Sequence, residues 1–348
     1  MKVYGEPTRS IRSLDNGTAV EIVDQTLLPY RFEKRVLGDW RDCVEAIRTM
    51  RVVLAVKENP ENDALLKAAE VIANARPTAV NLSWAVRRMM STLLPRDPAL
   101  RFEAAVKTAE AMTQEDVMTC RAIGEAGMTL ISDLYARLRR PVNVLTHCNA
   151  GWLATVDYGT ALSPIYMAFE QGTPLHVWVD ETRPRNQGLL TAWELGQHGV
   201  PYTLVADNAG GQLMQQCDVD LVIVGADRIT RRGDVANKIG TYLKALAAVD
   251  NEVPFYVAAP SSTIDWTLND GKREIPIENR AASELLVVNG VGSDGETRTV
   301  QIAAPEVAVA NPAFDVTHNR FVTGIITERG IVKPTDLTAV FADLLPKA

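Results

Sequence analysis

The sequence lacks a run of about 18 consecutive apolar residues, the shortest stretch expected to span a bilayer as a helix. Its first 16 residues mix charged residues with Gly and Pro, and they contain no apolar core of a secretory signal. We therefore expect a soluble, cytoplasmic protein that makes no contact with a membrane.

Cysteine and histidine are scarce, with four of each in 348 residues. The cysteines form no CxxC pair, so we expect reduced thiols rather than disulfides. The histidines lack a metal-ligand spacing such as HxxxH, and we expect neither a metal nor another cofactor. The net charge is −7, and Lys and Arg form no long stripe, which argues against a nucleic-acid partner. A phosphate could still bind, because its site needs only a few local donors.

The distribution of helix-forming and apolar residues divides the chain into two parts. Residues 1–112 are rich in helix formers, and we expect a smaller, mostly helical N-terminal domain with short strands. Within 113–348, short apolar runs alternate with helical segments, a pattern typical of a parallel sheet covered on both faces. We therefore predict an α/β fold with a Rossmann-like catalytic C-terminal domain. The expected strands are 142–146, 175–179, 202–206, 221–225 and 255–258. The expected helices are 40–50, 63–75, 81–94, 114–138, 188–198 and 235–249.

Ligands of such sheets bind at the carboxyl ends of the strands, and Cys148 follows the first predicted strand. We expect a helix to open there with Asn149 as its cap. Its N-terminus would bind a phosphate and lower the pKa of the Cys148 thiol. The alternative is that Cys148 is a small buried apolar side chain. His147 alternates to the other face of the strand end, and we interpret it as structural.

The loop 180–188 after the second strand combines carboxylates, cations and amides. Gln187 in this loop is an amide able to bond sugar hydroxyls, although a solvated surface loop is the alternative. Asp227 follows the fourth strand, where apolar surroundings would raise its pKa and let it act as an acid. Its alternative role is to cap the loop that follows.

Further along, Asp234 is placed to cap a helix whose first turn contains Asn237 and Lys238. Donors in that turn, together with the helix dipole, would favour an anion, whereas the alternative for Lys238 is a solvated charge. A thiol and a carboxyl at neighbouring strand ends, beside phosphate donors, indicate proton-transfer chemistry on a phosphorylated molecule.

Several segments together resemble the methylthioribose-1-phosphate isomerase family. Its superfamily also holds ribose-1,5-bisphosphate isomerases and regulatory subunits of a translation-initiation guanine-exchange factor. The matching segments are Asp-Gln-Thr-Leu-Leu-Pro at 24–29, Ala-Arg-Pro-Thr-Ala-Val-Asn-Leu at 75–82, Thr-His-Cys-Asn-Ala-Gly at 146–151, Glu-Thr-Arg-Pro at 181–184 with Gln-Gly at 187–188, Val-Gly-Ala-Asp-Arg-Ile at 224–229, Gly-Asp at 233–234 with Asn-Lys-Ile-Gly-Thr-Tyr at 237–242, and Asn-Pro-Ala-Phe-Asp-Val-Thr at 311–317.

The resemblance implies an aldose–ketose isomerase of methionine salvage that converts 5-methylthioribose 1-phosphate into 5-methylthioribulose 1-phosphate, and it also suggests a homodimer. The phosphate on the anomeric oxygen blocks spontaneous ring opening. By the family's motifs, Asp227 protonates the ring oxygen and later shuttles a proton. Cys148 moves the proton between C2 and C1 or supports a hydride-like route. The family's substrate contacts correspond to Arg76, Gln187, Asn237 and Lys238.

One segment departs from the family pattern. After Met50 the family has an Arg-Gly-Ala-Pro loop that contacts the phosphate, and most of that loop is absent here. Arg51 is the cation left at the join, and we assign it as a phosphate contact. We expect that residues of this loop are missing between Met50 and Leu54. One pair of consecutively numbered Cα atoms there would then lie much farther apart than the distance of about 3.8 Å between bonded neighbours. An unbroken backbone would instead indicate a true deletion and weaken the case for full activity.

Three other classes fit parts of the pattern. A nicotinamide dehydrogenase would use Asp180 as a ribose ligand, but no G-x-G-x-x-G follows the first strand, and Asp180 lies beyond the usual spacing of about 20 residues. A non-catalytic regulatory subunit would need neither Cys148 nor Asp227. Isomerases of ribose 1,5-bisphosphate or 5-deoxyribose 1-phosphate also fit, because the pocket for the C5 substituent is not identifiable from the sequence.

Overall fold

The computed structural model describes residues 1–14, 17, 19–37, 56–74 and 77–346. Its centre is a seven-stranded sheet with the order β18-β17-β12-β9-β6-β7-β8, in which every neighbouring pair is parallel except β17 and β18. The strands are β6 Val142–Thr146, β7 Leu175–Asp180, β8 Tyr202–Val205, β9 Leu221–Val224, β12 Phe255–Ala258, β17 Gly324–Thr327 and β18 Gly330–Val332. The predicted α/β, Rossmann-like fold class is confirmed.

The sheet is buried on both faces because successive side chains of each strand enter different cores. Val144 and Val177 join one core with residues of α4 and α5, whereas Leu145 and Val222 join another with residues of α7 and α8. Two-sided burial explains why these strands are continuous apolar runs in the sequence. The covering helices are α4 Pro98–Leu138, α5 Ser163–Glu170, α6 Gln187–Gln197, α7 Ala209–Gln215 and α8 Thr241–Asp250.

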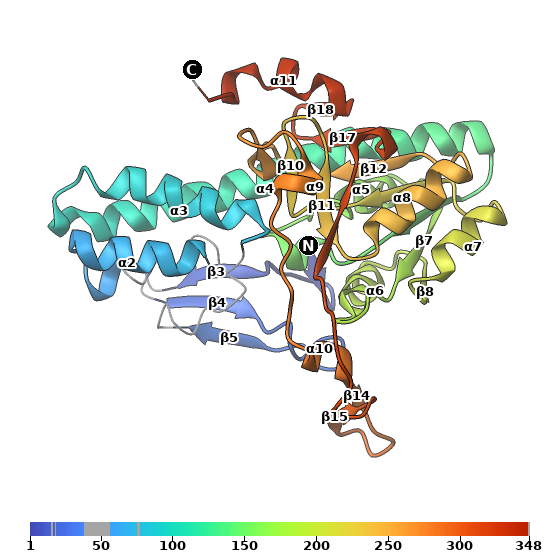
Figure 1. The fold of residues 1–348 in the computed structure, drawn as a ribbon, viewed down its shortest axis with the longest axis horizontal. Coiled ribbons are helices and arrows are strands. Elements are labelled where there is room, and N and C mark those ends of the chain that lie inside the picture. Colours follow the sequence, from blue (N-terminus) through green and yellow to red (C-terminus); the bar gives the residue numbers. More distant parts are fainter. Residues whose placement is uncertain (15–16, 18, 38–55, 75–76, 347–348) are drawn as a thin grey trace.

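The 41-residue helix α4 links the two ends of the molecule, as Figure 1 shows. Asp97 caps it by accepting a hydrogen bond from the N–H of Ala99 at 2.9 Å. Its Ala109 packs in the N-terminal core and its Ile123 in the sheet core. Since α4 runs unbroken past residue 112, the division into domains 1–112 and 113–348 stays a prediction.

Among its described residues, the N-terminal part combines a three-stranded antiparallel sheet with two helices (Figure 1). Two short strands, β1 Lys2–Val3 and β2 Glu6–Pro7, precede them. The larger elements are β3 Ile11–Leu14, β4 Ala19–Val23, β5 Lys34–Leu37, α2 Asn62–Ala73 and α3 Val80–Leu93. The expected helix 40–50, the expected chain break between Met50 and Leu54, Arg51 and Arg76 all lie outside the described residues.

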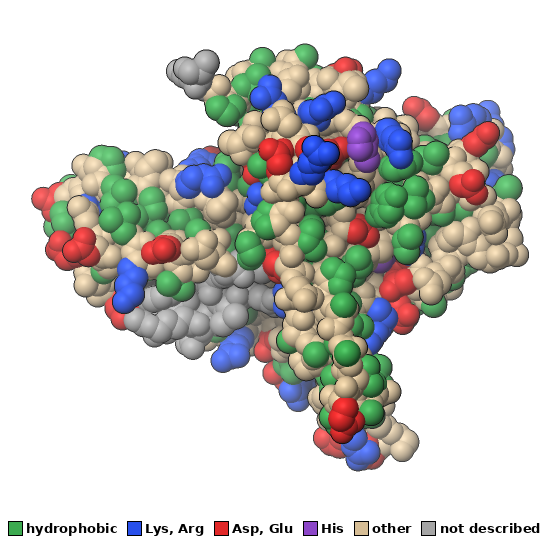
Figure 2. Space-filling view, in the orientation of Figure 1, with side chains coloured by type: hydrophobic (Ala, Val, Ile, Leu, Met, Phe, Trp, Pro, Cys, Tyr) green, Lys and Arg blue, Asp and Glu red, His purple; other side chains and the backbone are tan. Residues whose placement is uncertain are grey.

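A second sheet of four strands has the order β13-β10-β11-β16. Its strands are β10 Arg228–Thr230, β11 Val235–Lys238, β13 Ile264–Asp265 and β16 Phe314–Thr317. The hairpin of β14 Val287–Val291 and β15 Thr297–Gln301 projects away from the body (Figures 1 and 2). The remaining short α-helices in the described residues are α9 Gly271–Glu274, α10 Ser283–Leu286 and α11 Leu337–Val340. No helix in the described ranges is both long and apolar enough to cross a bilayer.

The predicted helix 235–249 is wrong over its first residues. Val235–Lys238 form strand β11, which pairs with β10 and β16, and helix α8 begins only at Thr241. Gly233, at a φ of +87°, turns the chain so that β10 and β11 form a hairpin. Asp234 does not cap α8. It accepts hydrogen bonds from the N–H groups of Gly271, the first residue of α9, and of Asn319, the first residue of a 3₁₀ helix.

Candidate active site

The central strands β6 and β9 form the topological switch point of the sheet. From β6 the chain proceeds outward through β7 and β8, and then it returns to β9 on the other side of β6. Cys148 lies two residues beyond β6, and Asp227 lies three residues beyond β9, at the same edge of the sheet. A crevice outside the carboxyl ends of parallel strands at such a point is the usual ligand site of this architecture. The structure therefore places the two predicted catalytic residues after neighbouring strands at one edge of the sheet.

Cys148 has an unusual backbone conformation, with a φ of +69°. A left-handed conformation at a residue other than glycine costs on the order of 1–3 kcal/mol and persists only where neighbours impose it. The N–H of Cys148 donates to the Thr182 hydroxyl at 2.9 Å, and its carbonyl accepts from the Thr191 hydroxyl at 2.8 Å. Both peptide groups that flank the Cys148 Cα are thus held by threonine side chains.

The helix expected to begin at Cys148 is absent from this segment. A loop follows, then the short 3₁₀ helix Trp152–Ala154, and α5 begins only at Ser163. The expectation that a helix dipole favours the Cys148 thiolate therefore has no basis here. Asn149 caps no helix, because its amide donates to Thr191 at 3.1 Å and Glu194 at 2.8 Å.

Asp227 lies where the seven-stranded sheet meets the N-terminal part. Its N–H donates to the carbonyl of Ala236 at 2.9 Å, and its carbonyl accepts from the N–H of Val80 at 3.2 Å, at the start of α3. The neighbouring Arg228 donates to the carbonyls of Pro77 and Thr78 at 2.8 and 2.9 Å. The segment that follows Arg76 is therefore attached to the Asp227 loop.

The polar loop after β7 is partly buried, with most of its residues half-exposed and Arg185 exposed. Asp180 and Thr182 are fully buried. Asp207, from the loop after β8, accepts hydrogen bonds from the N–H groups of Thr182 and Arg183, both at 2.7 Å. The loop ends at Gln187, the first residue of α6, whose buried Oε1 has no hydrogen-bond partner among the described residues. Such an orphaned acceptor in a strand-end loop is suited to a ligand donor.

Asn237 and Lys238 lie at the end of strand β11 and are 4% and 5% exposed, so Lys238 is not a solvated surface charge. The amide of Asn237 donates to the Thr241 hydroxyl at 3.0 Å. The ammonium of Lys238 lies 4.5 Å from the centre of the Phe314 ring, a favourable cation–π position. The next residue, Ile239, places its carbonyl 2.8 Å from Nε2 of His147, which joins this strand end to the Cys148 loop.

His147 belongs to a buried charged network behind the site. Its Nδ1 lies 2.8 Å from Asp180, whose carboxylate also lies 3.1 Å from the Lys244 ammonium. Burial raises the pKa of nearby Asp315 to about 6, although the N–H groups of Gly240 and Tyr242 lower it. His147, Asp180 and Asp207 form a group of metal-ligand type, and the Lys244 ammonium already provides a cation there.

Glu194 was not identified from the sequence, because a glutamate in a helical pattern is usually solvated. In the structure it is completely buried on α6. Burial raises the pKa of Glu194 to about 7, although hydrogen bonds from Asn149, Leu153, Tyr166 and Trp152 oppose this rise. The sequence contains no signal that would have placed this carboxyl beside the Cys148 loop.

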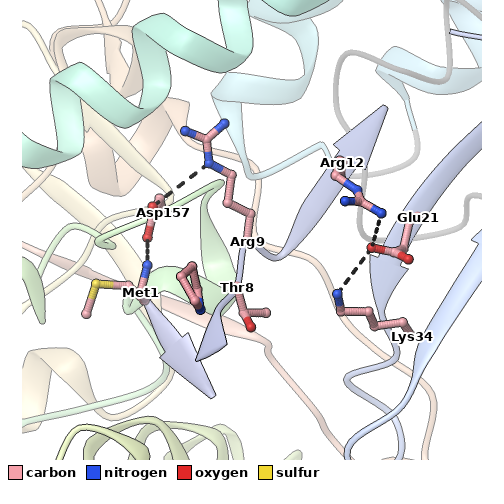
Figure 3. A pocket seen from close by; sticks show the side chains of 8 residues that line it. Met1, Thr8, Arg9, Arg12, Glu21, Lys34 and Asp157 are labelled. Carbon is pink, nitrogen blue, oxygen red and sulfur yellow. Dashed lines mark hydrogen bonds and ion pairs between the residues drawn. The ribbon is translucent and has the colours of Figure 1, made fainter. Parts of the chain in front are cut away.

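A cavity of about 450 Å³ lies apart from these strand ends, beside the N-terminal strands (Figure 3). It is lined by Met1, Pro7, Thr8, Arg9, Arg12, Glu21, Lys34 and Asp157. Glu21 forms ion pairs with Arg12 and Lys34 at 3.5 and 3.3 Å, and Asp157 lies 4.0 Å from Arg9. Because its cations face carboxylates and no strand-end residue lines it, we do not assign chemistry to this cavity.

Comparison with known proteins confirms the resemblance inferred from the motifs. The model of the initiation factor 2 subunit family matches residues 35–334. This chain belongs to that family. It is 54% identical over 346 residues to a methylthioribose-1-phosphate isomerase of Methylorubrum extorquens, covering 95% of both chains. It is also 54% identical over 361 residues to the enzyme of that name from Acidiphilium cryptum, covering 99% of this chain and 98% of the relative.

Two solved structures share the whole fold. One is 5-methylthioribose 1-phosphate isomerase from Pyrococcus horikoshii OT3, with a TM-score of 0.80 and 36% identity over 97% of both chains. The other is translation initiation factor eIF-2B, subunit delta, from A. fulgidus, with a TM-score of 0.76 and 37% identity. That comparison covers 97% of this chain and 100% of the other. The same fold therefore occurs in proteins named for catalysis and for translation initiation.

Proposed function

We propose that this chain is an aldose–ketose isomerase that converts 5-methylthioribose 1-phosphate into 5-methylthioribulose 1-phosphate. The observation that carries the proposal is the position of Cys148 and Asp227 at adjacent strand ends of the switch point. Full-length relatives above 50% identity that bear the isomerase name support it.

The reaction needs an acid because the phosphate on the anomeric oxygen prevents the ring from opening by itself. Asp227 protonates the ring oxygen as its bond to C1 breaks, and it later accepts the proton that the C2 hydroxyl releases as the ketone forms. The hydrogen of C2 must reach C1. In the proton route the thiolate of Cys148 carries it, whereas in the hydride route it migrates directly and Cys148 supports the reacting carbons.

The substrate contacts in this proposal are Gln187, Asn237 and Lys238, together with Arg51 and Arg76. The unpartnered Oε1 of Gln187 is suited to accept a hydrogen bond from a sugar hydroxyl. The buried cation of Lys238 is suited to a phosphate, since a cation in a low-dielectric setting interacts strongly with an anion. Arg51 and Arg76 enter the proposal through the family resemblance alone.

The decisive experiment is a side-by-side assay of the purified protein on three sugar phosphates. These are 5-methylthioribose 1-phosphate, 5-deoxyribose 1-phosphate and ribose 1,5-bisphosphate. We expect the highest kcat/KM for the methylthio sugar, and a clear preference for either other compound would reassign the substrate. In D₂O, deuterium at C1 of the ketose would indicate the proton route, and complete retention of hydrogen would indicate the hydride route.

A non-catalytic regulatory subunit is the second candidate, because the A. fulgidus eIF-2B delta structure matches the entire chain. The two candidates differ in one measurable property. A folded, homogeneous preparation that turns over none of the three sugar phosphates would favour the regulatory role.

Assembly and location are further parts of the proposal. We infer a homodimer, which light scattering would show as twice the chain mass of 38.1 kDa. We also infer a cytoplasmic location, since a doubly charged sugar phosphate does not cross membranes unaided. Cell fractionation followed by immunoblotting would test it, and recovery with the membranes would contradict it.

A further inference from the structure

One face of helix α6 lies against the Cys148 loop. Gln187, Thr191 and Glu194 are separated by four and three residues, so they share a side of the helix. Thr191 and Glu194 both contact the segment Cys148–Leu153. The helix that begins with a proposed substrate contact therefore also holds the proposed catalytic loop.

The Thr191 hydroxyl makes two directed contacts. It donates to the carbonyl of Cys148 at 2.8 Å and accepts from the amide of Asn149 at 3.1 Å. A hydroxyl can do both at once because it has one proton and two lone pairs. Thr191 is fully buried, so water cannot replace it when it is removed.

Glu194 extends this contact along the loop. Its Oε1 accepts from Asn149 at 2.8 Å and from the N–H of Leu153 at 3.1 Å. Its Oε2 accepts from the N–H of Trp152 at 2.9 Å and from the hydroxyl of Tyr166 at 3.0 Å. One carboxyl thereby orients two side chains and two backbone amides. Gly151 lies between Asn149 and Trp152, and a Cβ added to it would overlap the carboxyl oxygens of Glu194.

We propose that Thr191 and Glu194 are positioning residues for Cys148, which hold its left-handed backbone and thereby aim its thiol at the substrate. The inference deepens the proposed isomerase function and rests on it. Neither side chain is assigned to touch substrate. They act through the carbonyl of Cys148 and the amides that follow it, and Thr182 holds the N–H on the other side.

The test is a comparison of three threonine variants. Thr191→Val keeps the shape of the side chain and removes both hydrogen bonds, whereas Thr191→Ser keeps the hydroxyl. Thr203→Val is the matched control, since Thr203 is exposed on the edge strand β8 and its hydroxyl bonds only to His176 among the described contacts. We expect Thr191→Val to lower kcat by about 10- to 100-fold with KM within about threefold, as for a misplaced catalytic group. Thr191→Ser should restore most of kcat, and Thr203→Val should behave as wild type.

A second measurement does not depend on turnover. The rate at which iodoacetamide alkylates Cys148, measured by peptide mass spectrometry, should change several-fold in Thr191→Val. The exposed Cys217 provides an internal reference whose rate stays constant. Glu194→Gln should change the Cys148 rate in the same way, and it provides a second variant if Thr191→Val folds poorly.

The outcomes separate the two proposals. If Thr191→Val matches wild type in kcat and in Cys148 alkylation, the positioning role is wrong. If its kcat falls only in step with its folded fraction and serine restores nothing, Thr191 is merely structural and the inference is also overturned. If wild type itself shows no isomerase activity, the proposed function fails, and the alkylation rates still decide whether α6 positions Cys148.

Discussion

Ala150 and Gly225 bring the two loops of the candidate site into direct contact. A Cβ built on Gly225 would lie 2.7 Å from the Cβ of Ala150, closer than two such atoms ever pack. Ala150 lies two residues after Cys148, and Gly225 lies two residues before Asp227. The spacing between the Cys148 loop and the Asp227 loop therefore depends on the absence of a side chain at Gly225.

We predict that Gly225→Ala separates these loops and lowers kcat by about 10- to 100-fold, because small displacements of reacting groups are this costly. Steady-state kinetics on 5-methylthioribose 1-phosphate would measure the loss. Gly290→Ala is the control, since a Cβ there meets nothing within 4 Å. Equal activity of the two variants would show that the loops adjust without consequence.

The assigned chemistry predicts large losses for the two central residues. Asp227→Asn removes the acid at constant shape, and Cys148→Ala removes the proton carrier. General acid–base groups contribute about 10²–10⁴-fold, and we expect kcat to fall at least that far while the circular dichroism spectrum is unchanged. Near-normal turnover in either variant would remove that residue from the mechanism.

The substrate contact assigned to Lys238 predicts a binding defect. Lys238→Gln removes a buried cation, and we expect KM to rise by about tenfold or more, since a hydrogen bond to a charged group contributes about 1.5–3 kcal/mol. Lys272→Gln, at an exposed position on α9, serves as the control. A KM that is equal in both variants would show that Lys238 does not contact the phosphate.

The buried carboxyl of Glu194 predicts a pH-dependent stability. Its pKa is raised from the ordinary 4.5 to about 7, so the folded state binds the extra proton between these values. The associated stability is present below pH 4.5 and is lost as the pH rises through 7. At about 1.4 kcal/mol for each pH unit, the loss is on the order of 3 kcal/mol.

Urea unfolding of wild type and Glu194→Gln between pH 5 and pH 8 would measure this effect. As the pH rises, the unfolding free energy of wild type should fall relative to that of Glu194→Gln. A difference that stays constant across this range would mean that Glu194 is ionised throughout.

Arg101 predicts a purely structural effect far from the site. It is 3% exposed, and its guanidinium donates to the carbonyls of Leu93 and Leu94, at the end of α3, and to those of Arg96 and Pro60. Arg101→Met should lower the unfolding free energy by about 2–4 kcal/mol, because four backbone carbonyls, one in a buried and three in partly buried hydrogen bonds, lose a charged donor. Arg121→Met, which breaks an exposed i,i+4 pair with Glu125, should change it by less than about 0.5 kcal/mol. An equal effect of both substitutions would contradict this role for Arg101.

The sequence predicted the structure correctly where a local pattern is compatible with a single kind of element. The predicted strands 142–146 and 255–258 match β6 and β12 residue for residue, because strands buried on two faces are continuous apolar runs. The motifs were likewise sufficient to identify the family to which the chain belongs. The prediction failed at 235–238, where a capping Asp234 suggested the start of a helix. Pairing with β10 and β16 outweighed that local preference.

What the sequence by itself determined is therefore the α/β fold class, the five parallel strands β6, β7, β8, β9 and β12, and the positions of Cys148 and Asp227 at their carboxyl edge, whereas β17, β18 and the four-stranded sheet were not predicted. Only the tertiary structure decided how Cys148 is held, since Thr182, Thr191 and Glu194 are distant in sequence and look like ordinary loop and helix residues. Local patterns report burial and backbone preference, whereas hydrogen bonds between distant segments depend on the packing that brings them together. The left-handed backbone of Cys148 exists because those segments meet around it.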